Sequence, residues 1–143
     1  LEKLIEITSS GDQLNKCYEI INENWNNRWF TKNCQNSWWM ADFKEMSVSL
    51  AAYSLKTYIA GDSGYPHLQS WIIEGSNDKE HWEIIDKQDS NAYLKGAGYS
   101  KMVKLNAPSN PYRYIRLMSN GPDHEGSYYL LLNSIEFFGT IYS

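Results

Sequence analysis

The sequence predicts an all-β fold, an antiparallel sandwich or jelly roll of about eight short strands. Two patterns carry this prediction. Apolar and polar residues alternate at two-residue spacing, and short runs rich in Ile, Val, Tyr, Trp and Phe are separated by Gly, Asn, Asp, Ser and Pro. A third observation is length, because 143 residues without a repeat or a linker are typical of one domain.

Each expected strand is a run of this kind, and in the clearest one Ile115 and Leu117 alternate with Arg116 and Met118. Such alternation is typical of a strand with one face on a core. The Ser-Asn-Asp-Lys sequence at 76–79 predicts a turn. The expected strands are residues 4–8, 38–43, 47–58, 68–75, 82–86, 100–105, 112–118 and 130–141, with a helical turn within 13–24.

The long loops are predicted to gather at one end of the sandwich, because successive antiparallel strands point in opposite directions. These loops are residues 59–67, 87–99 and 119–129, and the irregular segment 17–37 is expected to join them. The opposite end receives the short turns at residues 44–46, 76–81 and 106–111. Function usually lies in long loops on a rigid scaffold, so we expect the binding site among the first set.

Charge and cysteine content exclude several classes of partner. The formal net charge of -4 argues against an electrostatic nucleic-acid binder and against a polybasic membrane anchor. No run approaches the ~18 apolar residues that span a bilayer. Two cysteines, Cys17 and Cys34, are too few for a secreted disulfide scaffold. We expect free thiols in a reducing, cytoplasmic compartment, and a single bridge between the two stays open as the alternative.

Five motifs, in order along nearly the whole chain, resemble the F5/8 type C (discoidin) domain family. The central motif is Ser-Trp-Ile-Ile-Glu-Gly-Ser-Asn-Asp at 70–78, followed by Trp82. The others are Ser-Trp-Trp-Met-Ala-Asp-Phe at 37–43, Tyr-Arg-Tyr-Ile-Arg-Leu at 112–117, Gly-Pro-Asp-His at 121–124 and Ile-Glu-Phe-Phe-Gly at 135–139. Their wording is most similar to that of intracellular protist members, which often follow a BTB or kelch-type domain.

The resemblance implies a galactose-binding-like jelly roll over residues 1–143, as one module of a larger protein. It does not specify a ligand, because relatives bind galactosides, anionic phospholipids, collagen or protein partners. The loop at 59–67 is polar and holds no Lys or Arg, which disfavours a membrane surface as partner. Both cysteines fall in the first quarter of the chain, unlike the disulfide that ties the ends of extracellular members, so an intracellular, even ciliary or cytoskeletal, location is expected.

Sugar recognition needs an aromatic face for the pyranose ring and planar polar groups for its hydroxyls. The expected long-loop end offers residues of both kinds, together with two histidines. The predicted ligand-binding residues are Trp25, Arg28, Trp29, Asp62, Tyr65, His67, Tyr93, Tyr99, Asp123, His124 and Tyr128. The alternative for each is structural: the aromatic rings fill the open end of the sandwich, and His124 braces its own loop.

Two further residue classes are weighed for metal binding and for packing. Carbohydrate-binding relatives usually hold calcium in a loop, and the candidates for it here are Asp12, Glu19, Glu23 and Asp62. No Asp-x-Asp-x-Asp spacing and no paired zinc ligands occur, so no metal site is predicted.

Trp71 and Trp82 are expected to pack across the sandwich, and Glu136 is expected to pair with Arg113 or Arg116.

The sequence lacks catalytic motifs: it has no Gly-x-Ser-x-Gly, Gly-rich phosphate loop or His-Glu-x-x-His. We therefore interpret the chain as a non-catalytic binding module. Its first expected ligand is a protein partner, its second a galactose-like carbohydrate, and its third role a structural part of a ciliary or cytoskeletal assembly.

Overall fold

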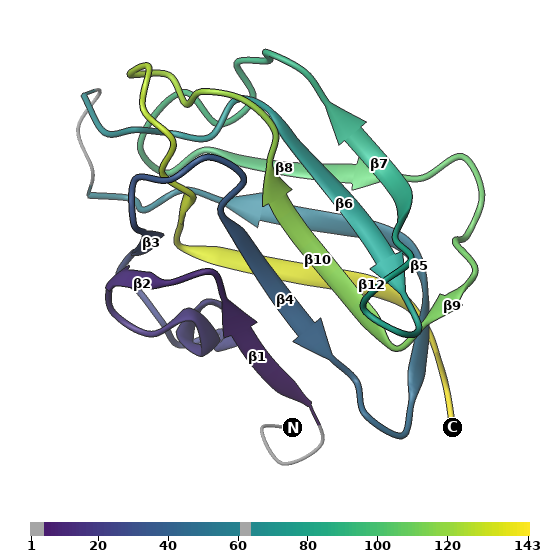
Figure 1. Cartoon of the computed structure of the whole chain (residues 1–143). Coiled ribbons are helices and arrows are strands. Elements are labelled where there is room, and N and C mark those ends of the chain that lie inside the picture. The colour runs from purple at the N-terminus through teal and green to yellow at the C-terminus, as the bar shows by residue number, and fades with distance from the viewer. Residues whose placement is uncertain (1–4, 61–63) are drawn as a thin grey trace.

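The chain folds as a sandwich of antiparallel sheets, seen in the computed structural model in Figure 1, which describes residues 5–60 and 64–143. The front layer is a five-stranded sheet in the order β1-β4-β10-β6-β7, and the back layer carries β12-β5-β8. A small third sheet, β11-β3-β2, lies beside the first strands of the chain. The predicted all-β jelly roll is confirmed.

The strands are short and most of them follow the expected runs. In chain order the elements are β1 (Glu6–Ser9), β2 (Asp12–Leu14), the 3-10 helix η1 (Cys17–Ile21), β3 (Trp29–Thr31), β4 (Trp38–Asp42), β5 (Ser47–Lys56), β6 (Trp71–Ser76), β7 (Glu83–Gln88), β8 (Ser100–Lys104), β9 (Pro111–Tyr112), β10 (Tyr114–Ser119), β11 (Leu131–Leu132) and β12 (Ser134–Tyr142). Two short strands, β2 and β3, fall in segments where no strand was expected, and β9 straddles the boundary between the expected turn at 106–111 and the expected strand at 112–118.

The core lies between the two layers and is built by two-residue alternation. On β10, Ile115 and Leu117 point inward and are fully buried, while Arg116 between them faces outward. Fully buried side chains from both layers meet them: Trp39, Leu50, Tyr53, Leu55, Trp71 and Ile73. The prediction for Trp71 is therefore confirmed.

A polar link also crosses the core between the layers. Tyr53 on β5 donates its hydroxyl proton to the Asp86 carboxylate on β7 at 2.5 Å, and it accepts a hydrogen bond from the Trp71 indole at 2.9 Å. Burial, and next the hydrogen bond to Asp86, raise the pKa of the Tyr53 phenol far above its ordinary value. The hydroxyl therefore stays protonated and joins the two sheets.

Contacts on the outer face of the five-stranded sheet show that the packing predictions for Trp82 and for Glu136 are wrong. Trp82 does not reach the core; its ring covers the Arg116 guanidinium, whose central carbon lies 3.8 Å from the ring centre. Arg116 pairs with Glu74, and Arg113 pairs with Asp42. Both predicted partners of Glu136 are therefore taken, and Glu136 itself is exposed on β12, in the opposite sheet.

The loops divide between the ends as predicted. Short connections join β4 to β5 and β6 to β7, whereas long ones follow β5, β7 and β10 at the other end, here called the long-loop end. Cys17 is buried and Cys34 is exposed, and both are free thiols. Among the described residues, no helix has the length and apolar character that a membrane crossing requires.

Candidate functional site

A pocket of about 300 Å³ opens at the long-loop end, and we call it the Arg28 pocket. Its walls come from three segments: the start of β3, the loop after β5, and the chain that leads into β11. The lining residues are Arg28, Phe30, Tyr65, Pro66, Tyr129 and Leu131. Three aromatic rings, two apolar side chains and a single cation thus surround the space, whose volume is at the small end of the range for ligand pockets.

Strand alternation on β3 decides which side chains reach the pocket. Trp29 is fully buried, and its indole donates a hydrogen bond to Asp12 Oδ1 at 2.8 Å. Its neighbours Arg28 and Phe30 therefore point the other way and line the pocket. The structure places the Trp29 ring in the core and not among the residues that line the pocket.

Two tyrosine rings hold the Arg28 guanidinium. Its central carbon lies 5.4 Å from the centre of the Tyr58 ring and 5.3 Å from that of Tyr65. The main chain is fixed as well, because the Asn15 amide donates to the Arg28 carbonyl at 2.7 Å. Cation–π contacts of this kind orient a guanidinium while leaving its in-plane N–H groups available.

Tyr129 is positioned by a ring and by a buried carboxylate. Its ring meets Phe30 edge to face, with centroids 5.6 Å apart. Its backbone N–H donates to Asp123 Oδ2 at 3.1 Å, and the same carboxylate accepts from the backbone N–H groups of Glu125 and Ser127. Asp123 is only 2% exposed. It therefore shapes the loop that carries Tyr129 and is not among the residues that line the pocket.

The main chains of the two predicted histidines, His67 and His124, link two loops at the long-loop end. His67 is 1% exposed, and its carbonyl accepts a hydrogen bond from the His124 backbone N–H at 3.0 Å. The His67 backbone N–H donates to the Tyr65 carbonyl, which links this junction to the pocket wall. Burial, then the nearby Lys95 charge, lower the pKa of His124. These bonds are made by the main chain, so whether the His124 ring binds ligand or braces its own loop stays a prediction.

The remaining predicted residues are scattered. Tyr93 and Tyr99 are about half exposed, and the Lys101 ammonium lies over the Tyr93 ring at 4.1 Å. Tyr128 is not among the lining residues, and its backbone N–H donates to the Asn33 side chain. Asp62 lies outside the described residues. The structure thus brings together two of the predicted residues, Arg28 and Tyr65.

Trp25 lines a second pocket, of about 340 Å³, between η1 and the start of β12. Glu23 and Glu136 also border this space, with the Asn133 amide beside them. Calcium takes carboxylate and amide oxygens as ligands. Glu23 thus borders a pocket that holds further side-chain oxygens, whereas Glu19 is not among its lining residues and Asp12 accepts hydrogen bonds from Ser9 and Trp29.

Sequence reasoning missed five residues that form the site: Phe30, Tyr58, Pro66, Tyr129 and Leu131. A signal for one of them, Phe30, exists in the sequence. Once Trp29 is assigned to the core, two-residue alternation places Arg28 and Phe30 together on the opposite face. The adjacent pair Tyr128 and Tyr129 offers no such signal, because a hydrogen bond to Asp123 sets the direction of that loop.

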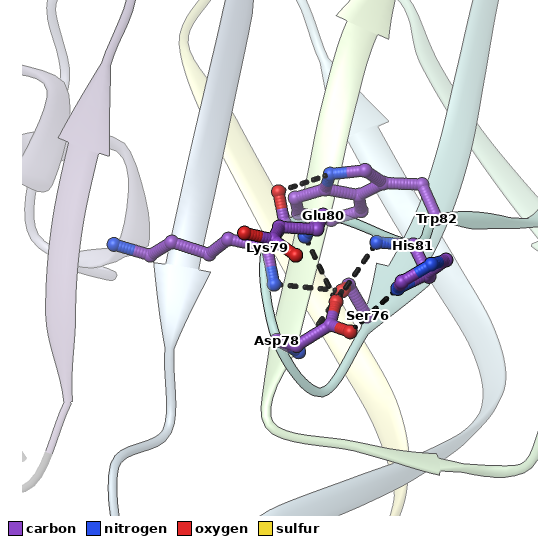
Figure 2. Close-up of polar contacts among 6 residues, drawn as sticks. All are labelled: Ser76, Asp78, Lys79, Glu80, His81 and Trp82. Atoms are coloured by element: carbon purple, nitrogen blue, oxygen red, sulfur yellow. Dashed lines mark hydrogen bonds and ion pairs between the residues drawn. The ribbon is translucent and has the colours of Figure 1, made fainter.

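The turn between β6 and β7 brings Asp78, Glu80 and His81 within reach of one another at the end away from the pocket. Figure 2 shows that Asp78 closes the turn: its Oδ1 accepts the backbone N–H groups of Glu80 and His81, each at 2.8 Å. These bonds hold the pKa of the Asp78 carboxyl far below its usual range, and the 2.7 Å contact with Asp78 Oδ2 raises the pKa of the His81 imidazole. Because both Asp78 oxygens already accept hydrogen bonds within the turn, we interpret this group of side chains as stabilising the turn and not as a metal site.

The Arg28 pocket suits recognition better than acid–base chemistry. Aromatic rings pack against the C–H faces of a sugar, and a guanidinium donates several hydrogen bonds in one plane. No carboxylate is found among its described lining residues, so the paired acids of a glycosidase are absent from this part of the pocket. The arrangement can bind and orient a small polar ligand with an apolar face.

Comparisons with known proteins identify the family of the chain and its fold. Residues 19–117 match the F5/F8 type C family profile described as a NedA-like, galactose-binding domain. A CBM32 module from a family 31 glycoside hydrolase of Clostridium perfringens aligns with a TM-score of 0.76 and 14% identity, over 97% of this chain and 93% of that one. No curated protein matches the sequence.

Two further structures resemble the chain and carry sugars. A CBM32 module of Clostridium perfringens in complex with GalNAc-β-1,3-galactose aligns with a TM-score of 0.73 and 12% identity, over 96% of this chain and 97% of that one. The family 32 CBM of C. perfringens NanJ in complex with galactose gives 0.71 and 10%, over 95% and 94%. At such identities the likeness establishes the fold.

Proposed function

The chain belongs to the F5/8 type C family of NedA-like, galactose-binding domains, and on that premise we propose that it is a non-catalytic carbohydrate-binding module. Its ligand is a monosaccharide unit, free or at the end of a glycan, held in the Arg28 pocket. Of our interpretations of the sequence, the carbohydrate alternative is thus preferred to a protein partner, which stays a prediction.

The observation that carries this proposal is the meeting of Arg28 and Tyr65 in a pocket with Phe30 and Tyr129. Rings that present a face to a sugar contribute contact area at little cost in conformational entropy, and the cation fixes the orientation of hydroxyl groups. A pocket at the small end of the ligand-binding range favours one sugar unit over a long stretch of polysaccharide.

The comparisons support the same class of ligand. Two of the structural neighbours hold galactose-containing ligands, and the family is described by galactose binding. Protein binding by an exposed sheet face has no comparable support. The intracellular location expected from the two cysteines and the assembly role also stay predictions.

A glycan array tests the proposal, with the domain applied in the presence and absence of calcium. We expect binding to glycans that present a terminal monosaccharide, and we expect Tyr65→Ala to abolish it. Tyr93→Ala is the matched control, because it removes an exposed tyrosine outside the Arg28 pocket. A folded wild-type protein that binds no glycan, or binding that Tyr93→Ala abolishes and Tyr65→Ala leaves intact, would contradict the proposal.

A further inference from the structure

We infer that the Arg28 pocket selects a sugar that carries a carboxylate, a hexuronic acid, in preference to the corresponding neutral hexose. The inference rests on the proposed function and names the substrate class of the same site. In this complex the C6 carboxylate of the sugar meets the Arg28 guanidinium, while the pyranose ring packs among the surrounding side chains.

The first support comes from the ion pairs that the three arginines of the chain form. Arg113 pairs with Asp42, at 2.9 Å from Nε to Oδ1, and Arg116 pairs with Glu74, at 2.5 Å from Nη2 to Oε1. Arg28 forms no ion pair within residues 5–60 and 64–143. Among the described residues, Arg28 is thus the arginine whose guanidinium meets aromatic rings and no carboxylate.

The charge of the pocket points in the same direction. Arg28 is the one charged side chain among its described lining residues, and the other five are aromatic or apolar. An apolar wall lowers the local dielectric constant, which strengthens the attraction between a guanidinium and an anion. A ligand with a carboxylate would place a negative charge beside this cation.

Geometry favours a planar anion over a single hydroxyl. The Tyr58 and Tyr65 rings contact the guanidinium, at 5.4 and 5.3 Å from its central carbon, and no described residue accepts a hydrogen bond from it. Its N–H groups lie in one plane and match the two oxygens of a carboxylate, as in bidentate Arg–carboxylate pairs. A neutral hexose can offer hydroxyl oxygens to the same groups, but those bonds are weaker.

The size and lining of the pocket fit a hexuronic acid. About 300 Å³ is at the small end for ligand pockets, which favours a six-carbon acid over a larger acidic sugar with a long side chain. The rings of Phe30 and Tyr129, held edge to face, and the Pro66 ring provide surface for the C–H faces of the pyranose.

The test compares sugars that differ at C6 alone. Binding of the methyl glycosides of galactose and galacturonic acid, and of glucose and glucuronic acid, is measured by isothermal titration calorimetry on the wild-type domain. We expect one of the acids to bind at least about 10-fold more tightly than its neutral partner, as for a charge-assisted pair against a neutral one. The methyl ester of that acid should bind like the hexose, and about 0.5 M salt should reduce the preference.

Variants assign the preference to Arg28. Arg28→Gln should remove it, so that acid and hexose bind equally, whereas Lys104→Gln, the same charge change at an exposed site on β8, should retain it. Arg28→Lys keeps the charge and should retain part of the preference. These variants are compared after thermal melting shows that they fold.

The outcomes separate the inference from the proposed function. Equal or tighter binding of the neutral hexoses overturns the inference and leaves the carbohydrate-binding function standing. A preference for the acid that survives Arg28→Gln overturns the assignment to this pocket. Failure of all four sugars, and of the glycan array, contradicts both proposals.

Discussion

Glu74 on β6 and Arg116 on the adjacent strand β10 are cross-strand neighbours, and they form an ion pair of 2.5 Å between Oε1 and Nη2. The Glu74 side chain is 7% exposed and that of Arg116 is 19% exposed. The Trp82 ring covers the guanidinium. This pair, and not one with Glu136, balances the charge on the outer face of the sheet.

Arg116→Ala is expected to lower the free energy of unfolding by about 3 kcal/mol, because it leaves the buried Glu74 carboxylate without its partner. Thermal melting should show a fall in Tm of about 10 °C for a domain of this size. Glu136→Gln is the control and should stay within about 0.5 kcal/mol of wild type, since Glu136 is exposed. Equal loss of stability in both variants would refute the assignment of the pair.

Tyr53→Phe tests the polar link across the core. The variant removes the acceptor of the buried Trp71 indole N–H and the donor to Asp86, so we expect a loss of about 1–3 kcal/mol in urea unfolding. Tyr142→Phe removes a hydroxyl from an exposed ring on β12 and should have no measurable effect. A stable Tyr53→Phe variant would show that the link does not contribute.

The core could be predicted from the sequence, because alternation over five or more residues identifies both faces of a strand. Ile115 and Leu117 lie inside as expected. Pairing between distant side chains could not be predicted in this way. Glu136 lies on β12 and Arg116 on β10, in different sheets, and only the order of strands shows that they cannot meet.

The position of the candidate site in the fold could be predicted from the sequence, but only some of the residues that line it could be. Loop lengths identify the long-loop end, and Arg28 and Tyr65 are among the residues that meet there. β3 spans three residues, which is too short for alternation to separate the buried Trp29 from the accessible Phe30. Asp123 is a polar residue in the right loop, yet its hydrogen bonds turn it toward its own backbone.

Asp123→Asn is expected to weaken sugar binding several-fold without a direct contact to the ligand. An amide in place of one carboxylate oxygen removes an acceptor from the loop and releases Tyr129 from its position. The same loss should cost about 1–2 kcal/mol of stability. Calorimetric titration at a temperature well below Tm separates the two effects. Asp89→Asn, at an exposed carboxylate, is the control, and equal binding by both variants would exclude a positioning role for Asp123.

His124 should make the stability of the domain depend on pH. Burial, then Lys95, lower its pKa in the folded state, so the unfolded chain takes up a proton more readily. This contribution is present above the unfolded pKa of about 6.5 and is lost as the pH falls below it. Tm should therefore fall less between about pH 7.5 and about pH 5.5 in His124→Gln than in wild type.

His81 provides a control of opposite sign. The hydrogen bond that the His81 ring donates to Asp78, and then the charge of Asp78, raise the pKa of His81 in the folded state, so its contribution is present at low pH and is lost as the pH rises. His81→Gln should therefore steepen the fall in Tm toward low pH. An identical pH profile for both variants and wild type would contradict these assignments.

The most direct test of carbohydrate binding by the Arg28 pocket is an NMR titration of the domain with galactose and galacturonic acid. We expect the chemical shifts of amides near Arg28, Tyr65 and Tyr129 to change with added sugar until they saturate, while those of the Asp78–His81 turn at the opposite end stay unchanged. Saturable shifts confined to other residues, or no shifts with either sugar, would contradict it.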